Sequence, residues 1–184
     1  MPKEKKKYDR VFDYLSDFYG AGEVGRSRLR KFVNDVAKIE SDGGRNDVNP
    51  DSSARGVFQF LTKGEGNSWQ TGLNRTESTL KRMGSSREWL DKARKHGDPR
   101  LEPYERQEDV FLADLFQKGP KGATNKLFRG IIEGDPNAAF ELYSKYHHTD
   151  PSHAPTQKLA AKVMGTGNYR HGGLIRDAYG RTLI

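Results

Sequence analysis

The sequence predicts a mainly α-helical domain in which one short irregular segment interrupts the helices. Apolar residues recur at helical spacing over most of the chain, and glycines or Asp-Pro pairs bound these stretches. Between Asp42 and about Gly72 the chain is instead rich in Gly, Asn, Asp and Ser, with one apolar run from Gly56 to Leu61. This composition is typical of loops with at most a small hairpin or a short helix.

The length of 184 residues suits one domain with a proper core. We expect a basic disordered tail at 1–7, the folded domain at 8–165, and a tail at 166–184 that packs on the same domain. The formal net charge of +7 predicts attraction to an anionic partner such as nucleic acid, a membrane surface or a bacterial cell wall. The chain has no cysteine, which excludes disulfides and cysteine-ligated zinc.

The amino-terminal stretch MPKEKKKYDRVFDYL is basic, but it contains no unbroken apolar run followed by a small-residue cleavage site. A secretory signal peptide is therefore not expected. No window approaches the roughly 20 apolar residues of a membrane-spanning helix, so membrane insertion is not expected either. These features predict synthesis in the cytoplasm.

Helical periodicity is clearest in six stretches. The first ends at Gly20, the second begins near Ser27 and ends at Gly43, and helical patterns return after Gly72. A later helix has Pro103 at its first helical position. The expected ranges are 8–19, 27–42, 104–118, a stretch around 127–132 that ends at Gly134, a helix that Asp135-Pro136 begins, and 156–164.

Glu40 is the first candidate for chemistry. It falls in the last turn of the second expected helix, and Ala37, Val36 and Val33 precede it on the same helical face. Burial and the partial negative charge of a helix carboxyl end would both raise its pKa. A glutamic acid that stays protonated near neutral pH can donate a proton to a leaving sugar oxygen. The alternative is that Glu40 turns outward into solvent at a frayed helix end.

A second candidate group lies in the apolar run of the irregular segment. Gly56 permits close backbone approach, and the amide of Gln59 can hydrogen-bond a sugar hydroxyl or an N-acetyl group. Phe58 stands beside Gln59, and we group it with these residues as substrate-binding or orienting. The alternative is an ordinary half-buried strand or helix turn.

Tyr143 and Tyr146 lie on the apolar face of one expected helix, where a tyrosine can pack its ring inward and offer its hydroxyl to a buried carboxyl group. The alternative is two ordinary core tyrosines. His147 and His148 follow, but adjacent helical residues point about 100° apart, and His153 lies beyond a proline. We therefore predict no metal site.

In this order, these residues resemble the soluble lytic transglycosylase family. That family shows Glu-Ser, a small-residue loop, a Gly-x-x-Gln run and a helix with Ala-Tyr or Leu-Tyr. The matching segments are Glu40-Ser41, Asn49-Pro50, Ser52-Ser53-Ala54, Gly56-Val57-Phe58-Gln59 and Leu142-Tyr143, so the likeness covers roughly 26–148. The Gln-Phe version, Asp98-Pro99-Arg100 and the Leu-Tyr helix resemble especially the transglycosylase domains of bacteriophage virions. In two departures, the interval from Glu40 to Gln59 is one residue longer than usual and Tyr143 lacks the following Asn.

The resemblance implies a lysozyme-like fold and a role for each matching residue. Glu40 would protonate the bond between N-acetylmuramic acid and N-acetylglucosamine, and then deprotonate the C6 hydroxyl to close a 1,6-anhydro ring. Ser41 and Tyr143 would orient or polarise Glu40, while Gly56 and Gln59 would line the sugar groove. Tyr146 is grouped with the orienting residues.

The resemblance also implies the partners. The substrate would be the glycan strands of bacterial peptidoglycan, with no cofactor and no metal. The protein would act on the cell wall as a virion component, in contact with other virion proteins, or as a released endolysin. Nucleic acid is not an expected partner.

Other functions remain open on the sequence. A hydrolytic, goose-type-like lysozyme would need a second carboxylate about 6.5 to 9.5 Å from the acid for inversion, or about 5 to 5.5 Å for a retaining nucleophile. Asp42, Asp47 and Asp51 lie in the right segment, and none is singled out. A basic helical nucleic-acid-binding protein would account for the net charge and the basic stretch at 26–31, but not for Glu40. A virion structural protein that has lost activity is a further alternative.

Overall fold

The computed structural model describes residues 7–64, 66–119, 122–148 and 154–165. Within these residues, eight α-helices and a small two-stranded antiparallel sheet form a mainly α-helical domain, which confirms the predicted class. The expected tails lie outside the described residues, apart from the exposed Lys7. None of the helices in the described ranges is long and apolar enough to cross a membrane.

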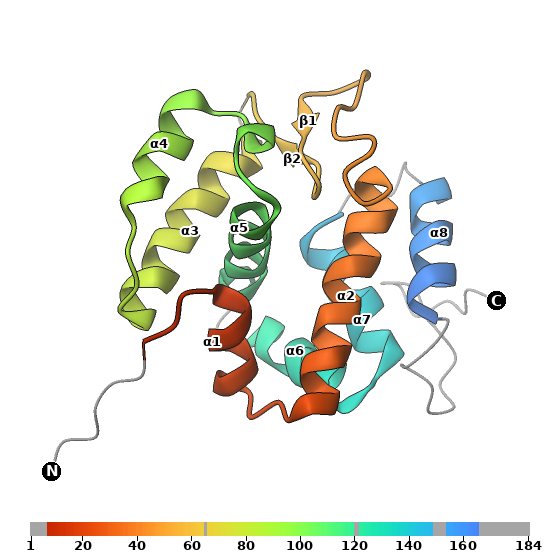
Figure 1. Ribbon diagram of the computed structural model, residues 1–184. Coiled ribbons are helices and arrows are strands. Elements are labelled where there is room, and N and C mark those ends of the chain that lie inside the picture. Colours follow the sequence, from red (N-terminus) through yellow and green to blue (C-terminus); the bar gives the residue numbers. More distant parts are fainter. Residues whose placement is uncertain (1–6, 65, 120–121, 149–153, 166–184) are drawn as a thin grey trace, which may run out of the picture.

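Figure 1 shows α3 and α4 on one side of the molecule, α2, α7 and α8 on the other, α5 between them, and the sheet at one end. The helix α3 packs chiefly on α5, and α2 packs on α6 and α8. In chain order the elements are α1 (Val11–Phe18), α2 (Glu23–Ser41), β1 (Ala54–Arg55), β2 (Phe60–Leu61), α3 (Ser68–Met83), α4 (Glu88–His96), the 3-10 helix η1 (Pro99–Leu101), α5 (Tyr104–Gln117), α6 (Ala123–Glu133), α7 (Pro136–Tyr146) and α8 (Ala154–Gly165).

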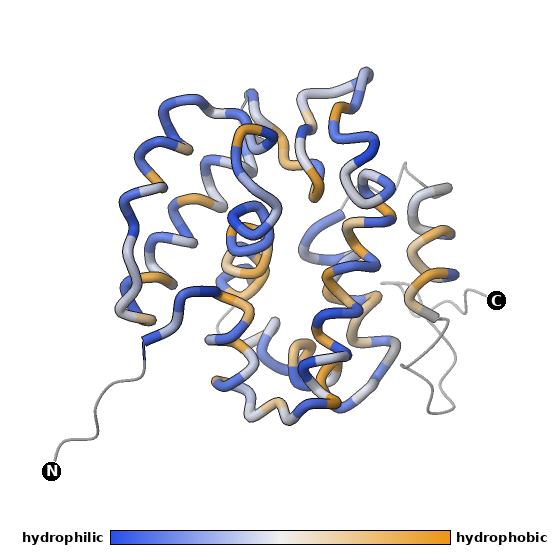
Figure 2. The backbone as a smooth tube through the Cα atoms, viewed as in Figure 1, coloured by the Kyte–Doolittle hydropathy of each residue, from blue (hydrophilic) through white to orange (hydrophobic). Residues whose placement is uncertain are grey.

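Short hydrophobic stretches recur along the helices between hydrophilic ones, as amphipathic helices require (Figure 2). The segment between the strands also contributes to the core, because the ring of Phe58 stacks on Phe111 of α5 at 4.4 Å between ring centroids. Phe111 in turn lies 6.1 Å from the ring of Phe32 in α2. These rings fix the strand connection against both helices.

Several predicted helix boundaries are wrong; the first helix, for example, begins at Val11 and not at Tyr8. Three of the differences have an identifiable physical cause. The helix α2 begins at Glu23, before the expected Ser27, and includes a buried Gly25. A Cβ at Gly25 would lie 2.7 Å from a side-chain carbon of Ile132, so this glycine serves close packing of α2 on α6 and not a helix end. The helix α3 begins inside the expected loop because the side chain of Asn67 caps it by accepting the backbone N–H of Gln70. Pro103 is the N-cap of α5 and not its first helical residue.

The four-residue connection between β1 and β2 is held to α5 by one buried amide. The strands pair Ala54 with Leu61, and Val57 in the connection donates its backbone N–H to Oε1 of Gln107 at 2.8 Å. Gly56 has a φ of +79°, and a Cβ there would lie 2.5 Å from the same Gln107 oxygen. The prediction that the glycine permits close backbone approach is therefore confirmed, and the approaching group is the Gln107 amide.

We expect Gln107→Leu to destabilise the fold by about 2 to 5 kcal/mol, measured by urea denaturation. Leucine would leave two buried groups without partners, the N–H of Val57 and the carbonyl of Glu102, which accepts from Gln107 Nε2 at 3.0 Å. The control is Gln70→Leu, which removes only a solvent-exposed side-chain contact to Asn74. Equal stability of the two variants would contradict the anchoring role.

Candidate active site

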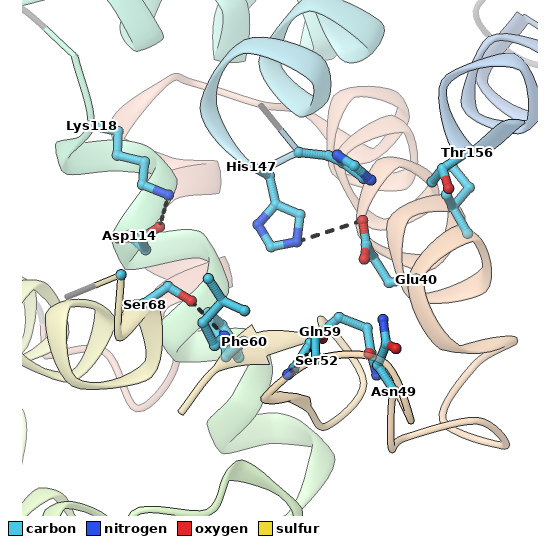
Figure 3. A pocket seen from close by; sticks show the side chains of 15 residues that line it. Glu40, Asn49, Ser52, Gln59, Phe60, Ser68, Asp114, Lys118, His147 and Thr156 are labelled. Atoms are coloured by element: carbon cyan, nitrogen blue, oxygen red, sulfur yellow. Dashed lines mark hydrogen bonds and ion pairs between the residues drawn. The ribbon is translucent and has the colours of Figure 1, made fainter. Parts of the chain in front are cut away.

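A cleft of about 670 Å³ opens where the carboxyl end of α2 meets the sheet and the ends of α5 and α7. Figure 3 shows Glu40 on one wall, Asp114 and Lys118 on the opposite side, and Asn49, Ser52 and Gln59 along the irregular segment. The lining residues among those described are Ile39, Glu40, Asn49, Ser52, Ala54, Gln59, Phe60, Leu61, Gly66, Ser68, Asp114, Lys118, His147, His148 and Thr156.

Glu40 lies in the last turn of α2 on its buried face, as predicted, with its side chain 10% exposed. The hydroxyl of Tyr143 in α7 donates a hydrogen bond to Glu40 Oε1 at 2.6 Å. The Nε2 atom of His147 lies 3.9 Å from the same oxygen. The structure therefore brings Glu40 and Tyr143 together from positions far apart in the sequence.

Burial raises the pKa of Glu40 to about 7, and the Tyr143 hydrogen bond opposes this rise only in part. The other buried carboxylates of the described chain all lie within ion-pair distance of a basic side chain: Asp35 of Lys31, Glu102 of His96, Glu108 of Arg10 and Arg30, Asp109 of Arg10 and Arg106, and Asp114 of Arg75 and Lys118. Glu40 instead faces a tyrosine and a histidine. Because no positive charge offsets the desolvation of Glu40, about half of this carboxyl group holds its proton near pH 7. Burial also raises the pKa of Asp109, to about 6, although its arginine partners oppose that rise.

His147 is a residue of the site that the sequence interpretation missed, because it was weighed only as a metal ligand. Its Nε2 lies 3.0 Å from the carbonyl oxygen of Phe58, and its ring packs edge-on against Phe111 at 5.0 Å. Burial, with Lys118 and His148 nearby, lowers the pKa of His147 to about 3, so the imidazole is neutral at physiological pH. No periodicity signal could have placed its ring against the strand connection.

Ser41 directs its hydroxyl toward the irregular segment. Its Oγ lies 2.8 Å from the carbonyl oxygen of Val57 and 3.1 Å from that of Ala37, and it accepts the N–H of Gly44 at 2.8 Å. The side chain thus joins the end of α2 to the loop, and Glu40 directly precedes it in the chain.

The remaining predicted site residues have different surroundings. Gln59 lines the cleft, adopts a left-handed backbone with a φ of +48°, and donates its amide to the carbonyl of Gly56 at 2.9 Å. Gly56 is buried against Gln107 and does not line the cleft. The ring of Phe58 is fully buried, so only its carbonyl reaches the site. Tyr146 packs beside Gly119 and is not itself among the lining residues.

The three aspartates considered as a second carboxylate are not among the lining residues. Asp42 pairs with Arg45 at 3.1 Å, Asp51 is exposed, and Asp47 lies near Arg100. Across the cleft, Asp114 forms ion pairs with Arg75 and Lys118. Among the described residues no group of three or more His, Cys, Asp or Glu side chains could hold a metal ion.

We expect Glu40→Gln to become more stabilising, relative to the unchanged protein, as the pH rises. The folded pKa of about 7 lies above the ordinary glutamate pKa of 4.5, so the folded state holds the proton more tightly and the stability from Glu40 is lost as the pH rises between these two values. Glutamine does not titrate. Denaturation at pH 4 and pH 8 should show the difference in unfolding free energy between the two proteins growing by about 3 kcal/mol. Glu141→Gln, in α7, controls for the amide change, and a difference that stays constant with pH would show that Glu40 is not buried as described.

We expect Tyr143→Phe to raise the pKa of Glu40 by about one pH unit, because the carboxylate loses a hydrogen-bond donor. Carbon-13 NMR of labelled glutamate side chains measures this directly. The matched control is Tyr146→Phe in the same helix, whose ring packs beside Gly119. If both variants shifted the Glu40 titration equally, the Tyr143 contact would not be the cause.

Comparison with protein-family models, curated proteins and solved structures finds no match to this chain. Neither a family nor a related fold can therefore be assigned by similarity. Within the cleft, the buried Glu40 with its Tyr143 and His147 neighbours has the most distinctive chemistry.

Proposed function

We propose that the protein is a peptidoglycan lytic transglycosylase with a lysozyme-like fold, and that Glu40 is its single catalytic acid and base. The observation that carries this proposal is the carboxyl group of Glu40, which has a pKa of about 7 and lies on the wall of a large cleft. It accepts a hydrogen bond from the Tyr143 hydroxyl. Cleavage of a glycosidic bond between amino sugars requires such a proton donor for the leaving oxygen. The order of motifs along the chain adds support.

In the first step, the protonated Glu40 gives its proton to the glycosidic oxygen between N-acetylmuramic acid and N-acetylglucosamine. The electron pair of the breaking C1–O bond stays with the leaving oxygen, and positive charge develops on the muramyl ring. Glu40 becomes a carboxylate. Tyr143 keeps donating its hydroxyl proton to Oε1 and so stabilises that charge.

In the second step, the Glu40 carboxylate takes the proton from the C6 hydroxyl of the same muramyl residue. The C6 oxygen then bonds to C1 and closes a 1,6-anhydro ring, so that water is not consumed and Glu40 is protonated again. The same group acts as acid and as base because its pKa is close to the working pH.

The wall formed by the irregular segment suits a carbohydrate. Asn49, Ser52 and Gln59 line it with neutral amide and hydroxyl groups, which can exchange hydrogen bonds with sugar hydroxyls and N-acetyl groups without adding charge. Lys118 stands on the opposite side of the cleft. The basic surface would attract anionic wall polymers, in keeping with a role as a virion component or an endolysin.

The transglycosylase is favoured over a hydrolytic lysozyme by the distribution of carboxylates. Among the described lining residues the second acid is Asp114, and Arg75 and Lys118 both pair with it, at 2.6 Å in the case of Lys118. A carboxylate held by two cations is a poor base for activating water, because each of its two oxygens already faces a positive charge. Asp42, Asp47 and Asp51 do not line the cleft.

The test is mass spectrometry of peptidoglycan after digestion by the purified protein. We expect muropeptides that end in 1,6-anhydro-N-acetylmuramic acid, and we expect Glu40→Gln to lower the rate at least a thousandfold, since no other lining carboxyl group is free of cations. Glu141→Gln is the matched control and should cleave at the normal rate. Reducing ends in the product would identify a lysozyme instead, and salt-dependent DNA binding with no cleavage would favour the nucleic-acid-binding alternative.

A further inference from the structure

His147 carries one N–H at a point between two acceptors. Its Nε2 lies 3.0 Å from the carbonyl oxygen of Phe58 and 3.9 Å from Glu40 Oε1. A carbonyl oxygen can only accept, so Nε2 must carry the proton. In the structure this proton is directed to the Phe58 carbonyl. The carboxyl group of Glu40, which faces the His147 ring in Figure 3, lies just beyond hydrogen-bond distance.

The surroundings hold the imidazole in this neutral form. Its ring is enclosed by aromatic rings, with Phe111 at 5.0 Å and Tyr143 at 6.0 Å between centroids. Lys118 at the end of α5 and His148 beside it in the chain both oppose a positive charge on His147. The neutral tautomer with the proton on Nε2 is thus the one that the site stabilises.

The same elements define what faces Glu40. From α7 and its end come Tyr143, His147 and His148, and from α5 comes Lys118, which is paired with Asp114. The irregular segment and α8 contribute neutral lining side chains, namely Asn49, Ser52, Gln59 and Thr156. Of these groups, Tyr143 already donates to Glu40, and His147 is a further donor, with its Nε2 within 4 Å of Oε1.

We propose that His147 is a positioning residue that lends its Nε2–H to Glu40 when Glu40 ionises. While Glu40 is protonated, the N–H stays on the Phe58 carbonyl. Once Glu40 has given up its proton, the charged oxygen is the stronger acceptor, and a movement of about 1 Å brings Nε2 within hydrogen-bond distance. No proton is transferred in this step, so His147 stays neutral and Glu40 stays a carboxylate.

This exchange links the charge on Glu40 to the strand connection. When the N–H leaves Phe58, the carbonyl next to Gln59 loses its partner, so the segment that lines the cleft responds to the ionisation of the acid. The catalytic consequence rests on the proposed function: the carboxylate intermediate gains a second donor only after the glycosidic bond has broken. Such a donor stabilises the charged state without lowering the ground state.

The decisive experiment is NMR of the unaltered protein labelled with nitrogen-15. The Hε2 and Nε2 signals of His147 should show the neutral Nε2–H tautomer at all pH values from 5 to 9, and they should shift with the midpoint of the Glu40 titration. In Glu40→Gln the shift should disappear. Signals that do not follow the Glu40 titration, or a proton on Nδ1, would overturn the proposal whether or not the protein cleaves peptidoglycan.

A variant gives a second, functional measurement. In His147→Leu we expect the pKa of Glu40 to rise by about half a pH unit and the maximal kcat to fall about tenfold with KM little changed, because only the charged state loses a donor. The alkaline limb of the pH profile would then move to higher pH, while the maximal rate falls. A role confined to folding would not move the limb, and that result would count against the proposal. If His147 follows Glu40 in the NMR titration but the unaltered protein cleaves no peptidoglycan, the proposed function fails and this coupling stands.

Discussion

The contact of Ser41 with Val57 is the connection on which the geometry of the site depends. The hydroxyl at the end of α2 lies 2.8 Å from the Val57 carbonyl, and the N–H of the same residue is held by Gln107 of α5. The helices α2 and α5 therefore hold the carbonyl and the N–H of Val57, respectively, by hydrogen bonds. Because Glu40 immediately precedes Ser41, and Phe58 and Gln59 immediately follow Val57, the acid and the cleft wall are fixed relative to each other without a direct contact.

The buried acids of this fold differ in whether their partners are positively charged or neutral. Glu108 and Asp109 are fully enclosed and join α1 and α2 to α5 through arginines, so their charges contribute to cohesion. Glu40 is almost as enclosed but has neutral donors around it. Burial raises the pKa of Asp109 to about 6 even though Arg10 and Arg106 oppose the rise, whereas at Glu40 only the Tyr143 hydrogen bond opposes desolvation and the pKa reaches about 7.

The sequence predicts the helices well because their apolar periodicity is local information, and it places Glu40 on a buried face for the same reason. It does not predict Gly25 inside α2, since the close approach of Ile132 is a tertiary contact. The residues of the candidate site likewise differ in whether the local sequence can predict them. Tyr143 was found through a motif that pairs it with an acid, whereas His147 and the inward turn of the Phe58 ring depend on how the strand connection meets α5 and α7, which no spacing along the chain encodes.

The cleft is assembled from segments that span most of the chain, from Ile39 to Thr156. No single helix or hairpin contains even half of its wall, so no folding intermediate with one missing segment can present a complete binding surface. Contacts of such long sequence separation form late, after the entropy of closing the intervening loops has been overcome. The cleft is therefore a product of the finished tertiary structure, and a nascent chain lacks it until every segment from Ile39 to Thr156 has been made.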